Sequence, residues 1–278
     1  MCRRLGGDWI NCGGGSEGLI NPLEPRPAPV DDEDDQRDAG PNKESAARLY
    51  VDEGHGMGAV ALHFKTFEVF IKLYMPDLSE IQKALLKKRL EIAEDKKNLE
   101  YLTVIVRELA EGADSFLWNG HTTVNPKSRF ICLDTFDLQN ISDTIKKTQY
   151  YNILTWAWEQ MSRNRGEKVL LVCDEAYLLV DPNVPQSLIF LRNVAKRARK
   201  YEAGLIIISH SVVDFLDPAV KMYGQALMDI PAYKILMGCD GKNLAETAEL
   251  YSLTEVEQDH LFTRSAATRC SSQGRSVC

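Results

Sequence analysis

The sequence predicts an α/β fold in which strands and helices alternate after residue 126. Two observations carry this prediction. Apolar runs of strand length recur between longer segments of helical periodicity, and the runs are apolar at consecutive rather than alternate positions. Strands joined by helices of this length run parallel, because only a long crossover connection brings the chain back in the same direction. We therefore expect a parallel sheet with helices on both faces.

Residues 1–59 are expected to form an N-terminal part of the α/β domain together with an acidic linker. A short strand is predicted at 8–12, ahead of a glycine cluster at 13–15 and a proline-containing extended path. The run DDEDDQRD at 31–38 is typical of a solvated linker, because like charges repel one another and bury no apolar surface. We assign no function to it.

Residues 60–125 are expected to form an all-α insertion between two parts of the α/β domain. The segment 60–75 is almost wholly apolar and is predicted to be a helix. Asp77 and Glu80 have the spacing of a capping box, in which each side chain bonds a free amide at the start of a helix. An amphipathic helix is predicted to follow from Ile81.

Residues 126–262 are expected to complete the α/β domain. Apolar runs predict strands at 130–133, 169–173, 205–208 and 233–237. Helical periodicity predicts helices at 142–161, capped by Ser142, and at 185–200. The tail at 263–278 is rich in Ser, Arg and Cys without a periodic pattern, and we expect it to be disordered.

The composition limits the classes of function. A formal net charge of −7 argues against a surface that is basic all over for nucleic acid, although a local basic lining stays open. The seven cysteines form no CxxC pair, which favours reduced thiols in a cytosolic protein. No apolar run reaches the roughly 18 residues that cross a bilayer, so any membrane contact is expected to be peripheral.

Two acidic residues, Asp174 and Glu175, directly follow the apolar strand predicted at 169–173. Ligands of parallel sheets bind beyond the carboxyl ends of strands. There an aspartate can hold Mg²⁺, while a neighbouring glutamate can orient and deprotonate an attacking water, as in hydrolysis of a nucleoside triphosphate. The alternative is a strand that merely ends in polar residues, and this stretch alone leaves the two readings equally open.

The next predicted strand, at 205–208, also ends in polar residues. Ser209 and His210 follow it, at the same edge of the sheet, and could sense a γ-phosphate through hydrogen bonds. Between the two strands lies a basic stretch that includes Arg197 and Arg199. These cations either remain solvated at a helix end, or contact a phosphate in a neighbouring subunit, a nucleic-acid backbone or a partner.

The chain has no phosphate-binding loop of the form GxxxxGK[ST], which nucleotide hydrolysis of this kind requires. Gly13–Gly18 is rich in glycine but contains no lysine. Gly238–Asn243 contains a Gly-Lys pair but no hydroxyl residue after it. We expect both segments to be turns.

A series of stretches in a fixed order resembles one protein family. They are INPLEP (20–25), LWNGHTTVN (117–125), EKVLLVCDEAYLLVDP (167–182), FLRNVAKRARKYEAGLIIISHSVVDFLDP (190–218) and YGQALMDIPAYKILMG (223–238). Through them, residues 5 to about 262 resemble the carboxyl-terminal part of the conjugal-transfer ATPases of type IV secretion systems. This is the family of the fourth VirB component, in the HerA/FtsK clan.

The resemblance implies a RecA-like P-loop NTPase core interrupted by an all-α insertion. Asp174 and Glu175 match the Walker B acidic pair, with Asp174 as the metal ligand, and Ser209 matches the sensor residue. His210 stands where the family usually has glutamine, which is a departure. Such proteins are similar in using ATP and Mg²⁺ and in assembling as hexamers, with nucleotide between subunits.

The family works at the cytoplasmic face of the cell membrane with secretion-channel components, and in some members with DNA, to power pilus assembly or the transfer of DNA and protein. Its phosphate loop and first strand precede the region matched by LGGDWI at 5–10, so we expect this chain to lack both and to be weakly active or inactive. The alternatives are a DNA-translocating motor of the same clan and a non-catalytic interaction module or degenerate fragment.

Overall fold

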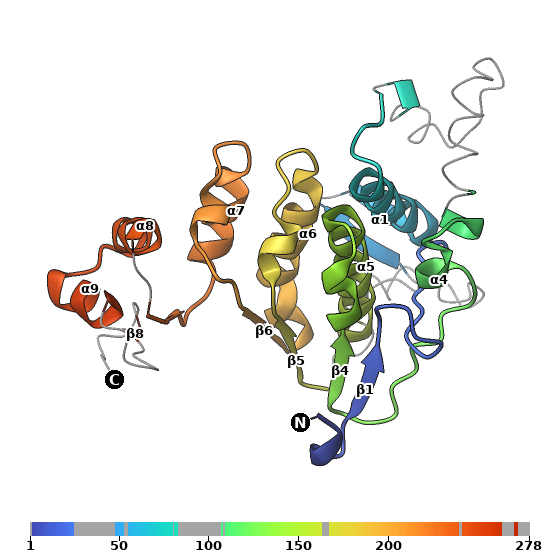
Figure 1. The fold of residues 1–278 in the computed structure, drawn as a ribbon, viewed down its shortest axis with the longest axis horizontal. Coiled ribbons are helices and arrows are strands. Elements are labelled where there is room, and N and C mark those ends of the chain that lie inside the picture. The colour runs from blue at the N-terminus through green and yellow to red at the C-terminus, as the bar shows by residue number, and fades with distance from the viewer. Residues whose placement is uncertain are drawn as a thin grey trace. The chain divides into compact units, whose positions relative to one another are not determined.

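A computed structural model describes residues 2–24, 48–52, 55–79, 81–82, 107, 109–162, 167–238, 241–262 and 270–271 (Figure 1). The chain divides into two compact units, Met1–Val169 and Leu170–Cys278. Three features predicted from the sequence lie outside the described residues: the acidic run 31–38, Glu80 of the capping box with most of the helix after it, and nearly all of the tail 263–278.

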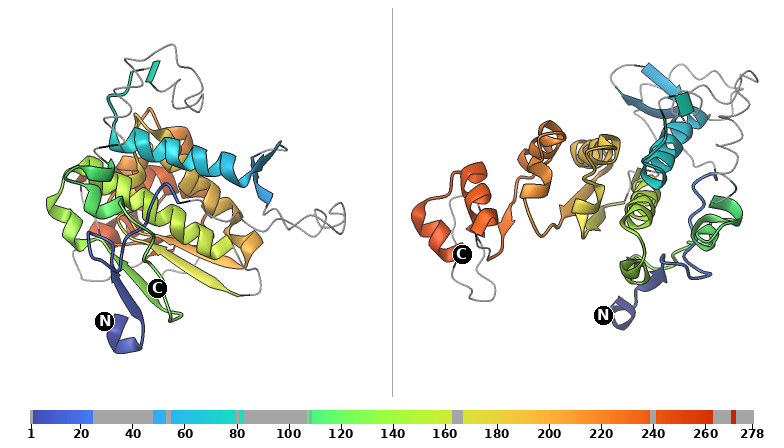
Figure 2. Two further views of the ribbon diagram at one scale, coloured as in Figure 1. Left: turned by 90° about the vertical axis from the view of Figure 1, so that its right-hand side faces the viewer. Right: turned by 45° about the horizontal axis from the view of Figure 1, so that its top comes forward.

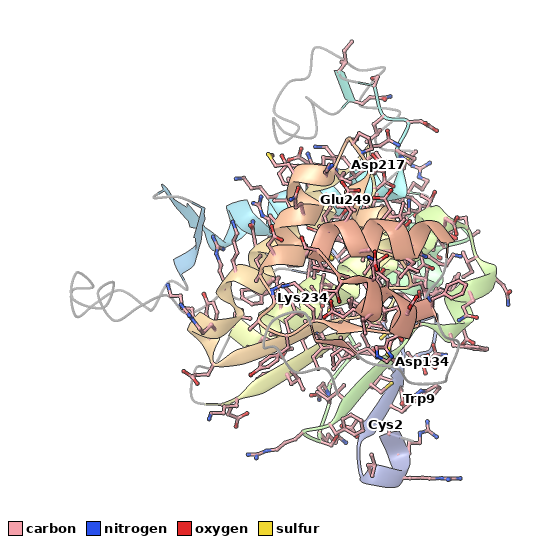
Figure 3. All side chains as sticks on the ribbon, turned by 90° about the vertical axis from the view of Figure 1, so that its left-hand side faces the viewer. Cys2, Trp9, Asp134, Asp217, Lys234 and Glu249 are labelled. Atoms are coloured by element: carbon pink, nitrogen blue, oxygen red, sulfur yellow. The ribbon has the colours of Figure 1, made fainter. Side chains whose placement is uncertain are left out.

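A pair of parallel strands organises the first unit. β1 (Asp8–Asn11) lies beside β4 (Ile131–Asp134), with Asp8 opposite Ile131 and Asn11 opposite Asp134. Trp9 and Asp134, labelled in Figure 3, belong to these two strands. Both strands were predicted within one residue of their observed ends, and their parallel direction confirms the expectation for an α/β fold.

Helices pack on one another beside this pair. α1 (Ala59–Tyr74) lies along α5 (Asp143–Ser162), as Figures 1 and 2 show. Phe70 and Tyr74 of α1 meet the ring of Trp118 edge-on, with centroids 5.2 Å apart in each case. Trp118 ends the short helix α4 (Ser115–Trp118). Whether residues 60–125 form a separate insertion stays a prediction.

The two helix starts predicted from capping residues differ in outcome. Ser142 caps α5 as expected, because its Oγ accepts a hydrogen bond from the Ile145 amide at 3.4 Å. The predicted box at Asp77 and Glu80 is displaced by two residues. The Ser79 amide donates to Gln82 Oε1 at 2.8 Å, and the Gln82 amide donates to Ser79 Oγ at 3.3 Å, which is the reciprocal pattern of a capping box.

An antiparallel hairpin that the sequence analysis did not predict precedes α1. Its strands are β2 (Arg48–Asp52) and β3 (His55–Gly58), and their register shifts between Leu49 and Asp52. A one-residue irregularity of this kind breaks the alternation of side chains that identifies a strand from sequence.

β5 (Val169–Cys173), which begins at the boundary between the two units, pairs with β6 (Ala203–Ile207) of the second unit. α6 (Pro185–Arg197) connects them and ends in a 3-10 turn at Ala198–Tyr201 (Figure 1). Pro185 starts α6 because its fixed φ suits the first helical turn, where a missing N–H costs nothing. The predicted adjacency of the strands at 169–173 and 205–208 is confirmed.

One face of the β5–β6 pair is exposed, which contradicts the expectation that helices cover the sheet on both sides. Side chains alternate between the faces of a strand. Leu170 and Val172 of β5 are 62% and 52% exposed, and Ile206 of β6 is 44% exposed. Cys173, on the opposite face, is only 4% exposed. The uniformly apolar sequence of these strands therefore does not indicate burial on both faces here.

The remainder of the second unit is mainly helical. α7 (Lys221–Asp229) packs against α6, while α8 (Gly241–Tyr251) packs against α9 (Glu255–Phe262). β7 (Ile235–Leu236) falls inside the strand predicted at 233–237, but it pairs antiparallel with β8 (Cys270–Ser271). No strand was predicted in the tail that contains β8. Among the described helices, none has both the length and the apolar character needed to cross a membrane.

Candidate functional site

The predicted carboxylate pair, Asp174 and Glu175, lies between the end of β5 and a 3-10 helix at Ala176–Leu179. Glu175 has a φ of 54°, in the left-handed region that residues other than glycine seldom adopt. The Glu175 amide donates to Asp174 Oδ1 at 3.0 Å, which holds the turn. Strained backbone of this kind persists only when the surrounding structure enforces it.

The loop after β6 (residues 208–213, the β6 loop) is hydrogen-bonded to the end of β5. The Ile208 amide donates to the Cys173 carbonyl at 2.9 Å, and the Ile208 carbonyl accepts from the Ala176 amide at 3.1 Å. Ile208 thus bonds the backbone on both sides of the carboxylate pair. These bonds place the β6 loop next to Glu175.

His210 of the β6 loop contacts the carboxylate pair directly. Its Nε2 lies 3.1 Å from Glu175 Oε1, within hydrogen-bonding distance. The ring of Tyr177 lies 6.0 Å from the His210 ring, centroid to centroid. Two residues that the sequence placed at the ends of different strands are therefore in contact.

The two oxygens of Glu175 have different surroundings. Oε1 faces His210, whereas Oε2 is buried and accepts no hydrogen bond from the part of the chain that the structure describes. The side chains of Glu175 and His210 are 40% and 74% exposed, so the contact itself lies at an open edge. A buried carboxylate oxygen without a donor is unfavourable, and a water or a cation would satisfy it.

The side chain of Ser209, the other residue predicted in the sensor position, bonds within the β6 loop. Its Oγ donates to the Ser211 carbonyl at 3.2 Å. Ser211 in turn donates from its Oγ to Asn243 Oδ1, at 2.5 Å, near the start of α8. Sequence reasoning missed Ser211 and Asn243 and took Gly238–Asn243 for a turn, whereas α8 begins at Gly241.

Arg197 and Arg199 lie away from the carboxylate pair of their own chain. Arg197 ends α6 and Arg199 lies in the 3-10 turn that precedes β6, whereas His210 follows β6. A five-residue strand spans roughly 16 Å, so the arginines lie at the opposite end of β6 from the site. Arg197 is half-buried and Arg199 is exposed.

The donors at the strand ends suit Mg²⁺ better than a transition metal. No cluster of three or more His, Cys, Asp or Glu side chains occurs among the described residues. Mg²⁺ commonly takes one or two carboxylates and completes its octahedron with water and substrate phosphates. The exposed carboxylate of Asp174 fits this mode of binding.

Cys173, immediately before the pair, does not belong to this donor set. The thiol is 4% exposed, and burial raises its pKa to about 12. A thiol with this pKa stays protonated at neutral pH, so it is neither a good metal ligand nor a nucleophile.

Comparison with known proteins finds similarity among solved structures. No protein-family model matches the chain, and no curated protein matches it. Among solved structures, the chain is similar to VirB4 of Thermoanaerobacter pseudethanolicus, with a TM-score of 0.81 and 37% sequence identity. The match covers 99% of this chain and 76% of that chain.

Proposed function

We propose, because the chain belongs to the VirB4 family of type IV secretion ATPases, that Asp174 and Glu175 form the hydrolytic edge of an ATP site. Family membership confirms the resemblance read from the sequence. The observation that carries the proposal is the 3.1 Å contact between Glu175 and His210 at the ends of adjacent strands. Contact between a candidate base and a candidate sensor is expected where water attacks a γ-phosphate.

In this proposal Asp174 is the protein ligand of Mg²⁺. ATPases of this type use ATP and Mg²⁺, and the ion, when bound, neutralises charge on the phosphate oxygens. Asp174 suits the task because its side chain is exposed at the end of β5 and its Oδ1 is oriented by the Glu175 amide.

Glu175 is proposed to orient and deprotonate the attacking water. His210 fixes Oε1, and this leaves Oε2 as the oxygen that can accept the proton of a water. His210 itself has a largely exposed ring, so it can donate to a phosphate oxygen or to Glu175 as the site fills. Ser209 donates to the Ser211 carbonyl within the β6 loop, and its role as the sensor residue stays a prediction.

Binding of metal–nucleotide at this edge can be tested by NMR without turnover. Mn²⁺ with ATP is expected to broaden the ring resonance of His210, because a paramagnetic ion at Asp174 lies close to it. Asp174→Asn should abolish the broadening. Asp214→Asn, which removes an exposed carboxylate of the same unit, should preserve it. Equal broadening in wild type and Asp174→Asn would refute the proposed metal position.

The 278-residue polypeptide is proposed to hydrolyse ATP slowly, because it contains no GxxxxGK[ST] motif to hold the β- and γ-phosphates. Turnover well below the roughly 1 s⁻¹ at the low end of ordinary enzymes is expected in a radiolabelled ATP assay. Any turnover above background should fall by about 10²-fold in Glu175→Gln, as loss of a general base requires. Glu202→Gln, at another glutamate with positive φ, is the matched control. Rapid turnover would contradict the proposed weak activity.

The finer family properties are part of the same proposal. We place nucleotide between subunits of a hexamer at the cytoplasmic face of the membrane, in contact with secretion-channel components and, where DNA is transferred, with DNA. Because Arg197 and Arg199 lie at the far end of β6 from their own carboxylate pair, either would reach a phosphate only in a neighbouring subunit. Light scattering with and without Mg-ATP tests the assembly, and a monomer under both conditions would refute it.

A further inference from the structure

The β6 loop is anchored on two sides. Toward β5, Ile208 bonds the backbone on either side of the carboxylate pair. Toward α8, Ser211 donates to Asn243 across 32 residues of sequence, at 2.5 Å. His210 lies between these anchors, so they determine where its backbone lies.

Ser211 is the point at which the loop is closed. Its Oγ donates to Asn243 and also accepts a hydrogen bond from the Val213 amide at 3.1 Å. Its carbonyl accepts the hydroxyl of Ser209 at 3.2 Å. Both neighbours of His210 in the sequence are therefore tied, while the ring itself is 74% exposed and has little packing of its own to hold it.

Asn243 offers a firm acceptor because α8 is itself docked. Residues four apart lie on the same face of a helix, and Thr247, four residues after Asn243, is 5% exposed. α8 also packs against α9. A side chain mounted on a packed helix holds its partner more accurately than one mounted on a loop.

We infer that Asn243 is a positioning residue of the proposed ATP site, which acts through Ser211 to hold the His210 ring against Glu175. The inference rests on the proposed function and adds a residue from a different element. The competing explanation is that this bond only ties down the start of α8.

Histidine NMR separates these explanations. The chain has only five histidines, so with ¹³C-labelled histidine the His210 ring resonance can be assigned by its loss in His210→Gln. Glu175→Gln then supplies a reference displacement for loss of the carboxylate charge that faces the His210 ring. All spectra are recorded at one fixed pH on the full 278-residue chain.

Asn243→Leu and Ser211→Ala are expected to move the His210 resonance toward its position in Glu175→Gln, while the other histidine resonances stay in place. Ser211→Thr keeps the hydroxyl and is expected to keep the wild-type position. Asn183→Leu, the same change at an exposed asparagine, is the control and should move none of them.

A His210 resonance that stays in place in both Asn243→Leu and Ser211→Ala, while Glu175→Gln moves it, would overturn the inference and leave the site intact. If Glu175→Gln itself has no effect, the Glu175–His210 contact and the function proposed from it fail instead. Should Asn243→Leu unfold the chain and collapse all histidine resonances, Ser211→Ala decides the matter, because it removes a single oxygen.

Discussion

The strand pairs β1–β4 and β5–β6 both end in polar side chains, and they differ in how completely these side chains are hydrogen-bonded. At the end of β1, Asn11 Nδ2 donates to Asp137 at 2.6 Å and Asn11 Oδ1 accepts the Gly13 amide at 2.8 Å. Asp134, at the end of β4, accepts the Phe136 amide at 3.0 Å. These polar side chains form hydrogen bonds with nearby residues of the same unit.

At the ends of β5 and β6 the polar groups are less completely bonded. Glu175 has one oxygen against His210 and a second that is buried without a donor among the described residues, and its backbone has a positive φ. Unsatisfied polar atoms and strained backbone are costly, and they tend to collect at functional sites. Acidic residues after an apolar strand therefore identify only a candidate site, and incomplete hydrogen bonding at that strand end supports the candidate.

The largest expected effect concerns the buried network behind β1. Gln149 is fully buried, accepts from Trp118 Nε1 at 2.7 Å and donates to the Cys12 carbonyl at 2.8 Å. Gln149→Ala leaves both partners buried and unpaired, at a cost of about 3 kcal/mol in the free energy of unfolding. Urea titration followed by tryptophan fluorescence measures this, because all four tryptophans lie in the first unit.

The matched control for this prediction is Gln139→Ala, at an exposed position of the same unit. A change within about 0.5 kcal/mol is expected there. If the two variants unfold at the same urea concentration, the hydrogen bonds of Gln149 do not stabilise the first unit at the end of β1.

A smaller loss is expected when the strand-end polar groups themselves are removed. Asn11→Ala deletes both hydrogen bonds of its side chain and should lower the unfolding free energy of the first unit by about 1 kcal/mol. His210→Ala removes an exposed contact, so the second unit should change by less than about 0.5 kcal/mol. Equal losses by circular dichroism in urea would remove the distinction between the two strand ends.

Relieving the backbone strain at Glu175 is expected to raise the unfolding free energy, whereas the substitutions above lower it. A left-handed backbone conformation costs a residue with a Cβ about 1–2 kcal/mol, and glycine avoids this cost. Glycine also loses more conformational entropy on folding, which offsets part of the gain. Glu175→Gly should therefore stabilise the second unit by about 0.5 kcal/mol. Glu202→Gly, with a φ of 53°, should give the same gain. Only Glu175→Gly should displace the His210 resonance. A loss of stability in Glu175→Gly alone would show that the carboxylate supports the fold.

The sequence predicted what local pattern determines. Apolar runs followed by polar residues identified β1, β4, β5 and β6, and the rule for strand ends brought Asp174, Glu175 and His210 together. The hairpin β2–β3 was not predicted because its register is irregular. The strand β8 was not predicted because two residues are too few to show a pattern. Asn243 could not be predicted, because its contact with Ser211 depends on how α8 docks 32 residues later in the chain.

The smallest predicted effect tests the start of β1, where a carboxylate oxygen of Asp8 accepts two backbone hydrogen bonds. Hydrogen bonds from the Ser128 and Lys127 amides hold the pKa of Asp8 below its usual value. A folded pKa that is lowered adds stability above the ordinary pKa, and this stability is lost as pH falls through the folded pKa. Wild type should therefore unfold at a higher urea concentration than Asp8→Asn at neutral pH, and the difference should shrink in acid. A difference that stays constant with pH would mean that the charge of Asp8 contributes nothing to this strand end.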